Sequence, residues 1–271
     1  MEKYFYPDSL EEAISLLETK KDIVAIAGGT EVNLKHRDVE YLVDLRDLGL
    51  SYIKSSKNEV RIGATTTIAE VEESSVIEHK ALHEAAAHFT ESVKHLATIG
   101  GNIVESVASS DMAPPLIALD AKAVLMGSKG ERVLPVYGMF KGLRRSSIEK
   151  GEILKEFILP RWNQNTSSSF QRVGRTEEDL SITSVAIRLT MENGRVKDVG
   201  IGVGLACPTP LKASKTEEFL KNNGLLVEEA SDVLIKETNP RSSIRASRNY
   251  RFLLEKTLFK RALLDCMEEL R

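Results

Sequence analysis

The sequence has almost no cysteine. Only Cys207 and Cys266 occur among 271 residues, they lie far apart, and neither belongs to a CxxC pair. A cysteine-ligated iron–sulfur cluster needs about four thiolates, so the composition excludes such a cluster on this chain alone. The same count excludes a framework of disulfides. We interpret both cysteines as reduced core residues of a cytoplasmic protein.

Long apolar runs and an excess of charge of one sign are also missing. No run approaches the roughly 20 apolar residues that span a bilayer, and the first residues lack the apolar stretch of a secretory signal. The formal net charge is -3, which excludes a bulk electrostatic attraction to nucleic acid or to acidic lipid. We therefore expect no membrane span and no nucleic-acid partner.

Histidine patterns of a metal site are absent as well. Of the five histidines, only His79 and His83 share a helical face, in the sequence HKALH. A zinc-protease helix would have the pattern HExxH, and no third ligand is evident. No hydrolytic arrangement stands out either. We expect no metal site and no catalytic side chain, and we interpret residues 79–83 as part of a surface helix.

The bulk composition is that of an ordinary globular protein. Hydrophobic residues make up 42% of the chain and charged residues 28%. This length accommodates one large domain or two to three small lobes, each with its own core. We divide the chain into an N-terminal lobe (residues 1–52), a middle lobe (53–165) and a C-terminal lobe (166–271). The polar stretch 163–169 is expected to be a linker.

The N-terminal lobe has the pattern of a small α/β unit. Residues 4–6 form a short strand candidate, and Ser9 with Glu12 fits a capping box at the start of an amphipathic helix. The apolar run 23–27 is short and stops at two glycines, which favours a buried strand over a helix. Residues 41–45 give another strand.

The remaining lobes combine strands and helices. The middle lobe begins with a strand at 59–63, continues with a helix through residues 81–89, and is expected to be α/β. In the C-terminal lobe, Asn193-Gly194 between two β-rich runs predicts a hairpin, so we expect an antiparallel sheet followed by helices. The last helix carries an apolar stripe that we interpret as core, namely Tyr250, Leu253, Leu254 and Leu258.

The first segment that could carry chemistry follows the strand at 23–27 and has the sequence Ala-Gly-Gly-Thr-Glu-Val. A strand that runs into two glycines exposes successive backbone N–H groups, and such a nest can hold a pyrophosphate. The segment is not GxGxxG, so the fold of nicotinamide-dependent enzymes is not supported. An ordinary turn remains the alternative.

A second glycine pair lies in a segment rich in hydroxyl groups. Thr98 and Asn102 flank Ile-Gly-Gly, and both side chains can bond to phosphate. Asp111 follows, and a carboxylate there can accept hydrogen bonds from sugar or ribityl hydroxyls. The alternative is an Asx turn ahead of Pro114. Residues 170–179 form a further polar strip, for which a solvated loop is the default interpretation.

Together these segments resemble the FAD-binding subunits of xanthine dehydrogenase and aerobic carbon monoxide dehydrogenase. The family's AGGTD motif is similar to residues 27–31, and its TIGGN motif to residues 98–102 with Asp111 after it. Four further segments match in the same order: 62–66, 152–154, 208–212 and 241–247. Six motifs in register over nearly the whole chain make coincidence implausible.

The resemblance implies an FAD cofactor between the first two lobes, in a fold of the vanillyl-alcohol-oxidase (PCMH) type, with the third lobe covering the flavin. It implies that the pyrophosphate is wrapped by Ala27, Gly28, Gly29, Thr30, Glu31 and Val32, and that Thr98, Gly101 and Asn102 complete this cradle. Asp111 would bind FAD hydroxyls, and Leu154 would pack near the isoalloxazine. Gln171 would stand where a lysine often approaches the flavin.

Two departures from the family pattern matter. Ser106-Val-Ala-Ser109 replaces the frequent Ala-Ser-Pro, and Gln171 replaces a frequent lysine, which removes a cation near the flavin ring and leaves its potential open.

The resemblance also implies partners: a large subunit with a molybdenum cofactor and a small subunit with two [2Fe–2S] clusters. Electrons would pass from them to FAD and on to an acceptor such as NAD. A stand-alone FAD oxidoreductase and a non-catalytic nucleotide-binding assembly module remain alternatives.

Overall fold

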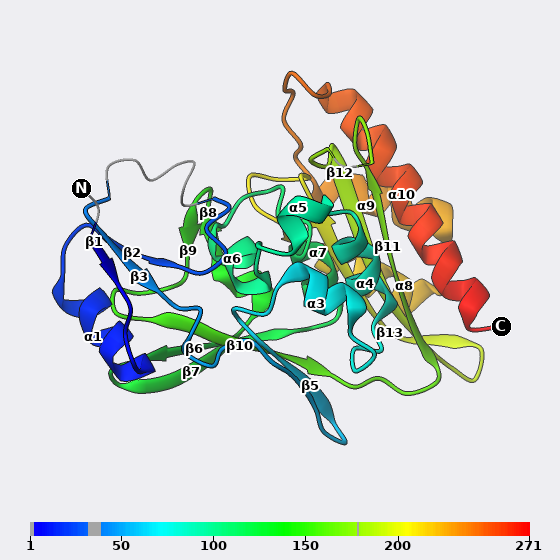
Figure 1. The fold of residues 1–271 in the computed structure, drawn as a ribbon. Helices are drawn as coiled ribbons and strands as arrows, with labels where there is room; N and C mark the ends of the chain where they lie inside the picture. Colours follow the sequence, from blue (N-terminus) through cyan, green and yellow to red (C-terminus); the bar gives the residue numbers. More distant parts are fainter. Residues whose placement is uncertain (1–2, 32–38, 178) are drawn as a thin grey trace.

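The N-terminal lobe is built on a small parallel sheet. The computed structural model describes residues 3–31, 39–177 and 179–271. The sheet has the order β1-β3-β2, and its elements are β1 (Lys3–Phe5), α1 (Leu10–Thr19), β2 (Ile23–Ile26) and β3 (Tyr41–Asp44). All four expected elements are thereby confirmed, and Figure 1 shows the lobe at one end of the molecule.

Helix α1 begins where the capping signal predicts it. The Ser9 hydroxyl accepts a 3.2 Å bond from the backbone N–H of Glu12. The Glu12 carboxylate in turn accepts a 2.9 Å bond from the N–H of Asp8, one residue earlier than in the standard box. Ala13, Ile14 and Leu17 are the buried face of this helix, as the apolar spacing indicates.

The middle lobe contains a five-stranded sheet with the order β4-β5-β10-β6-β7. Every neighbouring pair in it is antiparallel, so the expectation of an α/β middle lobe is corrected to α+β. The strands come from distant parts of the lobe: β4 (Ile53–Ser55), β5 (Glu59–Gly63), β6 (Lys122–Gly127), β7 (Gly130–Pro135) and β10 (Ile153–Pro160). A short hairpin, β8 (Phe140–Gly142) and β9 (Arg145–Ser146), follows the 3-10 helix Val136–Met139.

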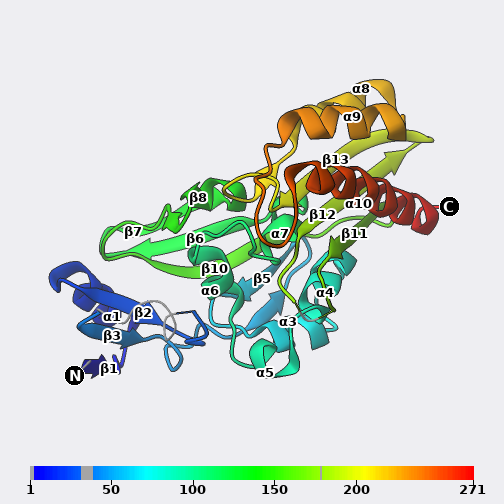
Figure 2. The ribbon, with the colours of Figure 1, turned by 90° about the horizontal axis from the view of Figure 1, so that it is seen from above.

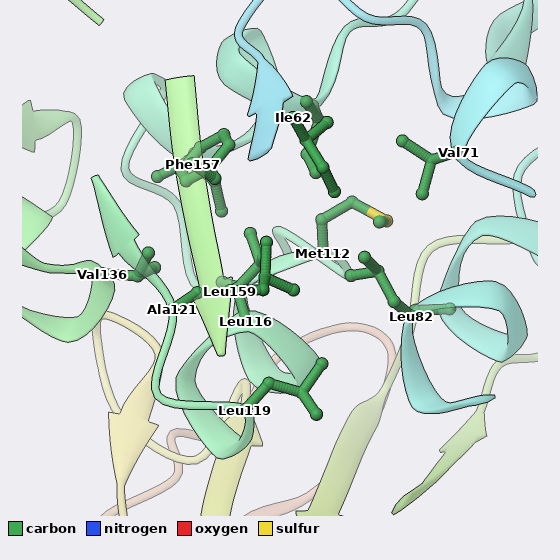
Figure 3. Close-up of a cluster of buried hydrophobic side chains, with 14 of the residues drawn as sticks. Ile62, Val71, Leu82, Met112, Leu116, Leu119, Ala121, Val136, Phe157 and Leu159 are labelled. Carbon is green, nitrogen blue, oxygen red and sulfur yellow. The ribbon is translucent and has the colours of Figure 1, made fainter. Parts of the chain in front are cut away.

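Five short helices connect β5 to β6, and their apolar sides meet the sheet. They are α3 (Ile68–Glu73), α4 (Lys80–Ala87), α5 (Glu91–Lys94), α6 (Ile99–Val104) and α7 (Ala113–Ala118). Figure 3 shows strand residues such as Ile62 and Phe157 facing helix residues such as Val71 and Leu82 across one buried cluster. This core fixes the positions of α6 and of the turn before α7.

The C-terminal lobe is a four-stranded antiparallel sheet followed by three helices. Its order is β11-β12-β13-β14, with elements β11 (Thr166–Val173), β12 (Thr183–Glu192), β13 (Arg195–Gly204), β14 (Leu211–Lys212), α8 (Ser214–Asn223), α9 (Val227–Glu237) and α10 (Arg248–Glu269). The predicted hairpin is confirmed, because Asn193 and Gly194 join β12 to β13 with φ of 51° and 73°. The expected linker is wrong from Thr166 onward, where β11 begins.

Helix α7 of the middle lobe packs directly on the sheet of the C-terminal lobe, as the view in Figure 2 shows. Gly202 makes this close approach possible, since a Cβ there would lie 2.1 Å from the carbonyl oxygen of Pro114. The buried Arg188 on β12 reinforces the contact by bonding to the Ala118 carbonyl and to Asp120. The two lobes therefore share one tightly packed boundary.

The apolar stripe expected on the last helix is only half buried. Leu254 and Leu258 are in the core, whereas the side chains of Tyr250 and Leu253 are 45% and 60% exposed. The buried face of α10 begins at Arg251 and continues with residues spaced three and four positions apart along the helix, such as Leu254 and Leu258. Tyr250 and Leu253 lie one position before members of this face and therefore point toward solvent. Both cysteines are free. In the part of the chain that the structure describes, no helix has the length and apolarity to cross a bilayer.

Candidate functional site

The loop after β2 packs against the middle lobe through its first glycine. A Cβ on Gly28 would lie 1.8 Å from the carbonyl oxygen of Leu96 and 3.2 Å from Cα of Ala97. The absence of a side chain at Gly28 thus serves contact with the protein itself. Gly29 has φ of 70°, in the left-handed region that favours glycine. The two glycines have different local roles.

This loop also presents backbone donors. Within the described residues, the N–H groups of Gly29 and Thr30 donate to no protein acceptor. Residues 27–31 are partly exposed, so these donors lie at the surface of the lobe, where they can meet an anion. Val32 was also expected to line this loop, and it lies outside the described residues.

The second glycine pair is arranged differently, because it forms the first turn of α6. Thr98 caps the helix by accepting a 3.1 Å bond from the N–H of Gly101. The N–H groups of Ile99 and Gly100 bond to the carbonyls of Thr66 and Ala64. Backbone donors are therefore already used in this turn, in contrast to the loop after β2.

Helix α6 can offer side-chain hydrogen-bond donors to a ligand. The Thr98 hydroxyl accepts one bond but keeps its own proton as a donor. Asn102 Oδ1 accepts from the N–H of Met112 at 3.3 Å, which leaves the amide NH₂ to donate elsewhere. Gly101 is exposed, and a Cβ there would meet only the Thr98 hydroxyl, at 2.9 Å. A bulkier residue would fill the space beside these donors.

Three segments meet at this place. The two glycine segments lie next to each other through the contact of Gly28 with Leu96. The segment after β5 pairs with the start of α6 through an isolated bridge between Thr67 and Thr98. Residues 27–31, 64–67 and 96–102, which the sequence motifs single out separately, are thus brought together.

Asp111 lies in the turn between α6 and α7 and is only 8% exposed. Its Oδ1 accepts a 2.7 Å hydrogen bond from the hydroxyl of Ser181. Burial raises the pKa of Asp111, while the Ser181 bond and the positive charge of Arg172 act to lower it. A second donor to this carboxylate would therefore stabilise its charged form.

Gln171 and Arg172 point in opposite directions, as neighbours on a strand do. The Gln171 amide donates a 2.7 Å bond to Asp265 on α10, so the structure does not bring it to Asp111. Arg172 faces the other side, where its guanidinium bonds to the carbonyls of Glu177 and Asp179. Sequence reasoning missed Arg172 and Ser181, and strand alternation from Gln171 is the signal that could have found Arg172.

Leu154 lies on β10 and is 4% exposed, within the core of the middle lobe. The strand bulges directly after it, between Leu154 and Glu156. The bulge lets the carbonyl of Lys155 accept a 2.9 Å bond from Ala64, at the start of the 64–67 segment. It is therefore the backbone of Lys155 that contacts the 64–67 segment, whereas Leu154 packs in the core.

The histidine pair does not lie on a surface helix. His79 is 5% exposed, and burial lowers its pKa to about 4. Both ring nitrogens of His83 lie within 2.8 Å of backbone carbonyls, those of Glu72 and Ile77. Over residues 3–31, 39–177 and 179–271, no group of three or more histidine, cysteine or acidic side chains is placed to hold a metal.

Two family models match this chain, one after the other along the sequence. Residues 1–162 match the model of the FAD binding domain in molybdopterin dehydrogenase. Residues 168–266 match the CO dehydrogenase flavoprotein C-terminal domain. The fold and the two matches define a flavin-binding oxidoreductase subunit.

Individual relatives are similar over nearly their full length. The xanthine dehydrogenase FAD-binding subunit of Escherichia coli O157:H7 is 30% identical, over 97% of this chain and 95% of that protein. The glyceraldehyde dehydrogenase medium chain of Sulfolobus acidocaldarius is 28% identical, over 97% of each. The solved carbon monoxide dehydrogenase of Hydrogenophaga pseudoflava superposes with a TM-score of 0.94 at 26% identity, covering 99% of this chain and 98% of that one.

The chain therefore belongs to the family of FAD-binding subunits of the molybdopterin dehydrogenases. The resemblance inferred from six short motifs is confirmed.

Proposed function

We propose that this chain is the FAD-carrying electron-transfer subunit of a heteromeric molybdenum hydroxylase. The observation that supports this most directly is the meeting of residues 27–31 with residues 96–102. One segment contributes free backbone N–H groups and the other contributes side-chain donors. This division fits a pyrophosphate, which needs several donors along two linked phosphates.

The site residues take distinct roles in this proposal. The N–H groups of Gly29 and Thr30 would bind the pyrophosphate, and Thr98 with Asn102 would donate from α6. Asp111 would accept from a ribityl or ribose hydroxyl as the second donor that its buried carboxylate favours. The cofactor would lie between the N-terminal and middle lobes, in the arrangement of the vanillyl-alcohol-oxidase (PCMH) fold.

The protein's part in the reaction is to bind, orient and shield. When bound, the flavin supplies the redox chemistry, taking electrons from iron–sulfur clusters and passing them to an acceptor such as NAD. The molybdenum cofactor would be on a large partner subunit and the two [2Fe–2S] clusters on a small one. No side chain of this chain is required as a general acid or base.

Flavin identity and metal content test the proposal. Heat release followed by mass spectrometry should yield FAD, because FMN has no pyrophosphate for the two glycine segments. FMN as the sole flavin would contradict the site. Elemental analysis of the complex purified through a tag on this chain should find molybdenum and iron. A metal-free preparation that turns over substrate would instead support a stand-alone oxidase.

A further inference from the structure

The segment that leads into α10 has an unusual charge pattern. From Arg241 to Leu254 there are four arginines and no lysine, aspartate or glutamate. The whole chain has a net charge of -3, so this run is a local excess of the opposite sign. Arg241 and Arg248 are exposed, and neither forms an ion pair with any residue that the structure describes.

The position of these arginines is unfavourable for the isolated fold. Arg248 is the first residue of a 22-residue helix that has no acidic residue in its first turn. Cations at a helix N-terminus oppose the helix dipole. The charges of Arg245 and Arg241 also act against the buried guanidinium of Arg251, and the charge of Glu255 acts in its favour. Such an arrangement is stabilised when an anionic surface covers it.

Apolar side chains are exposed around the same arginines. The side chain of Ile244 is fully exposed, and Tyr250 and Leu253 are 45% and 60% exposed. Arginine, tyrosine and large apolar residues are typical of the contact surfaces between proteins, whereas lysine and acidic residues are depleted there. An isoleucine that stands fully in water favours a protein partner over a small anion, which would bind in a recess.

This surface adjoins the proposed flavin site. The Arg251 guanidinium bonds to the carbonyl of Ile182 and, at 3.0 Å, to the hydroxyl of Ser243. Ser181, the residue before Ile182, is the one that bonds to Asp111. Two consecutive residues, Ser181 and Ile182, therefore link the buried Asp111 carboxylate to Arg251 at the start of α10.

We propose that Arg241, Ile244, Arg245, Arg248, Tyr250 and Leu253 form a docking surface, the arginine surface, for the acidic face of the partner protein that carries the iron–sulfur clusters. The positive charge of this surface favours an acidic partner. The surface is also near Asp111 and therefore near the proposed flavin site, and the iron–sulfur protein is the partner that must approach the flavin to deliver electrons. The inference rests on the proposed function.

The test compares two charge reversals in the native complex, purified through a tag on this chain. The double variant Arg241→Glu/Arg248→Glu alters the arginine surface. Arg195→Glu is the control, since Arg195 is the first residue of β13, beside the hairpin turn that follows the far end of β12. Iron, FAD and protein are measured in each preparation. The variant places an acid in the first turn of α10, so its melting temperature should not fall.

The expected result is a loss of iron per chain of about tenfold or more in the double variant, the effect of roughly one to two disrupted interfacial charge pairs. FAD per chain should remain at the wild-type value, and the control should keep its iron. Full iron in the double variant, or equal loss in the control, would overturn the docking surface while leaving the flavin assignment intact. Wild-type complex without FAD or without iron would overturn the proposed function, and this inference with it.

Ile244→Asp provides a second, independent variant. The fully exposed side chain has no packing to lose, so the fold should be unaffected. Loss of iron on this change would show that the apolar part of the arginine surface is also buried by the partner. Retention of iron in both this variant and the double variant would exclude the surface as an interface.

Discussion

Ser181 on the C-terminal lobe donates a 2.7 Å hydrogen bond to Asp111 on the middle lobe. The bond connects the proposed cofactor site to a lobe that contributes neither glycine segment. Since burial raises the pKa of Asp111, the single hydroxyl does not fully replace the water that the carboxylate has lost. The site thus has an acceptor whose charge is stabilised by further donors.

Replacing Asp111 by alanine should weaken FAD binding by about 1.5–3 kcal/mol, the usual range for a hydrogen bond that involves a charged group. Asp111→Asn should weaken it as well, because the amide has lost the anionic acceptor. Titration of the apo-protein with FAD measures both affinities.

The two Asp111 variants also separate the ligand role from a turn role. Asparagine serves well in an Asx turn, so protein stability should fall mainly in the alanine variant. Wild-type affinity in Asp111→Asn would show that the charge is irrelevant and would remove Asp111 from the site.

The affinity for FAD should depend on pH through the same carboxyl. The pKa of Asp111 is raised above its ordinary value of 3.8, and a hydroxyl donor binds the charged form more tightly. Affinity should therefore be constant at high pH and fall as the pH is lowered through this raised pKa. Titrations at a series of pH values test this, and Asp111→Asn should give a flat profile over the same range.

Local signals predicted the N-terminal lobe and the hairpin well, because both depend on short-range chemistry. Ser9 and Glu12 cap α1, and Asn193 with Gly194 adopts the positive φ values that the turn needs. The two glycine segments were found for the same reason, since each is contiguous in sequence, and their role in binding FAD stays a prediction.

Features that depend on long-range packing were missed. The bond from Ser181 to Asp111 spans 70 residues, and no local pattern indicates it. Thr166 to Ser169 resemble a linker, yet they pair with β12 and form part of a sheet. The first turn of α6 resembles a phosphate nest, but the backbone of Ala64 and Thr66 occupies its donors.

Gly29→Val should abolish flavin retention while the far-UV circular dichroism stays near that of the wild type. A β-branched residue resists φ of 70° and would block the approach of a phosphate to the loop. Gly49→Val is a matched control, because Gly49 has φ of 68° with open space around it. Both variants carry similar strain, and only Gly29→Val should lose FAD. An unchanged FAD content in it would reduce the loop to a turn.

Arg172→Gln and Gln171→Lys should have different effects on the flavin. Removing the Arg172 charge raises the pKa of Asp111 further and frees the loop that Arg172 holds, so FAD affinity should fall. A lysine at position 171 faces Asp265 on α10, where an ion pair forms away from Asp111. Flavin potential and affinity should therefore stay at wild-type values in Gln171→Lys. A shifted potential there would show that residue 171 does approach the ring.

Acid should destabilise the fold through His79. The pKa of this buried histidine is about 4, against 6.5 for the free side chain. Between these values the unfolded chain binds a proton that the folded chain excludes, so stability is lost as the pH falls below 6.5. At pH 5 the loss amounts to about 2 kcal/mol.

Glu255 acts in the opposite direction, since burial raises its pKa to about 7 and its proton uptake stabilises the fold as the pH falls from 7. The His79 effect must therefore be isolated by comparing the wild type with His79→Gln, in urea unfolding at pH 7.5 and pH 5. The variant should lose about 2 kcal/mol less than the wild type between these two pH values. Equal losses in both proteins would mean that His79 takes up its proton in the folded state as readily as in the unfolded chain.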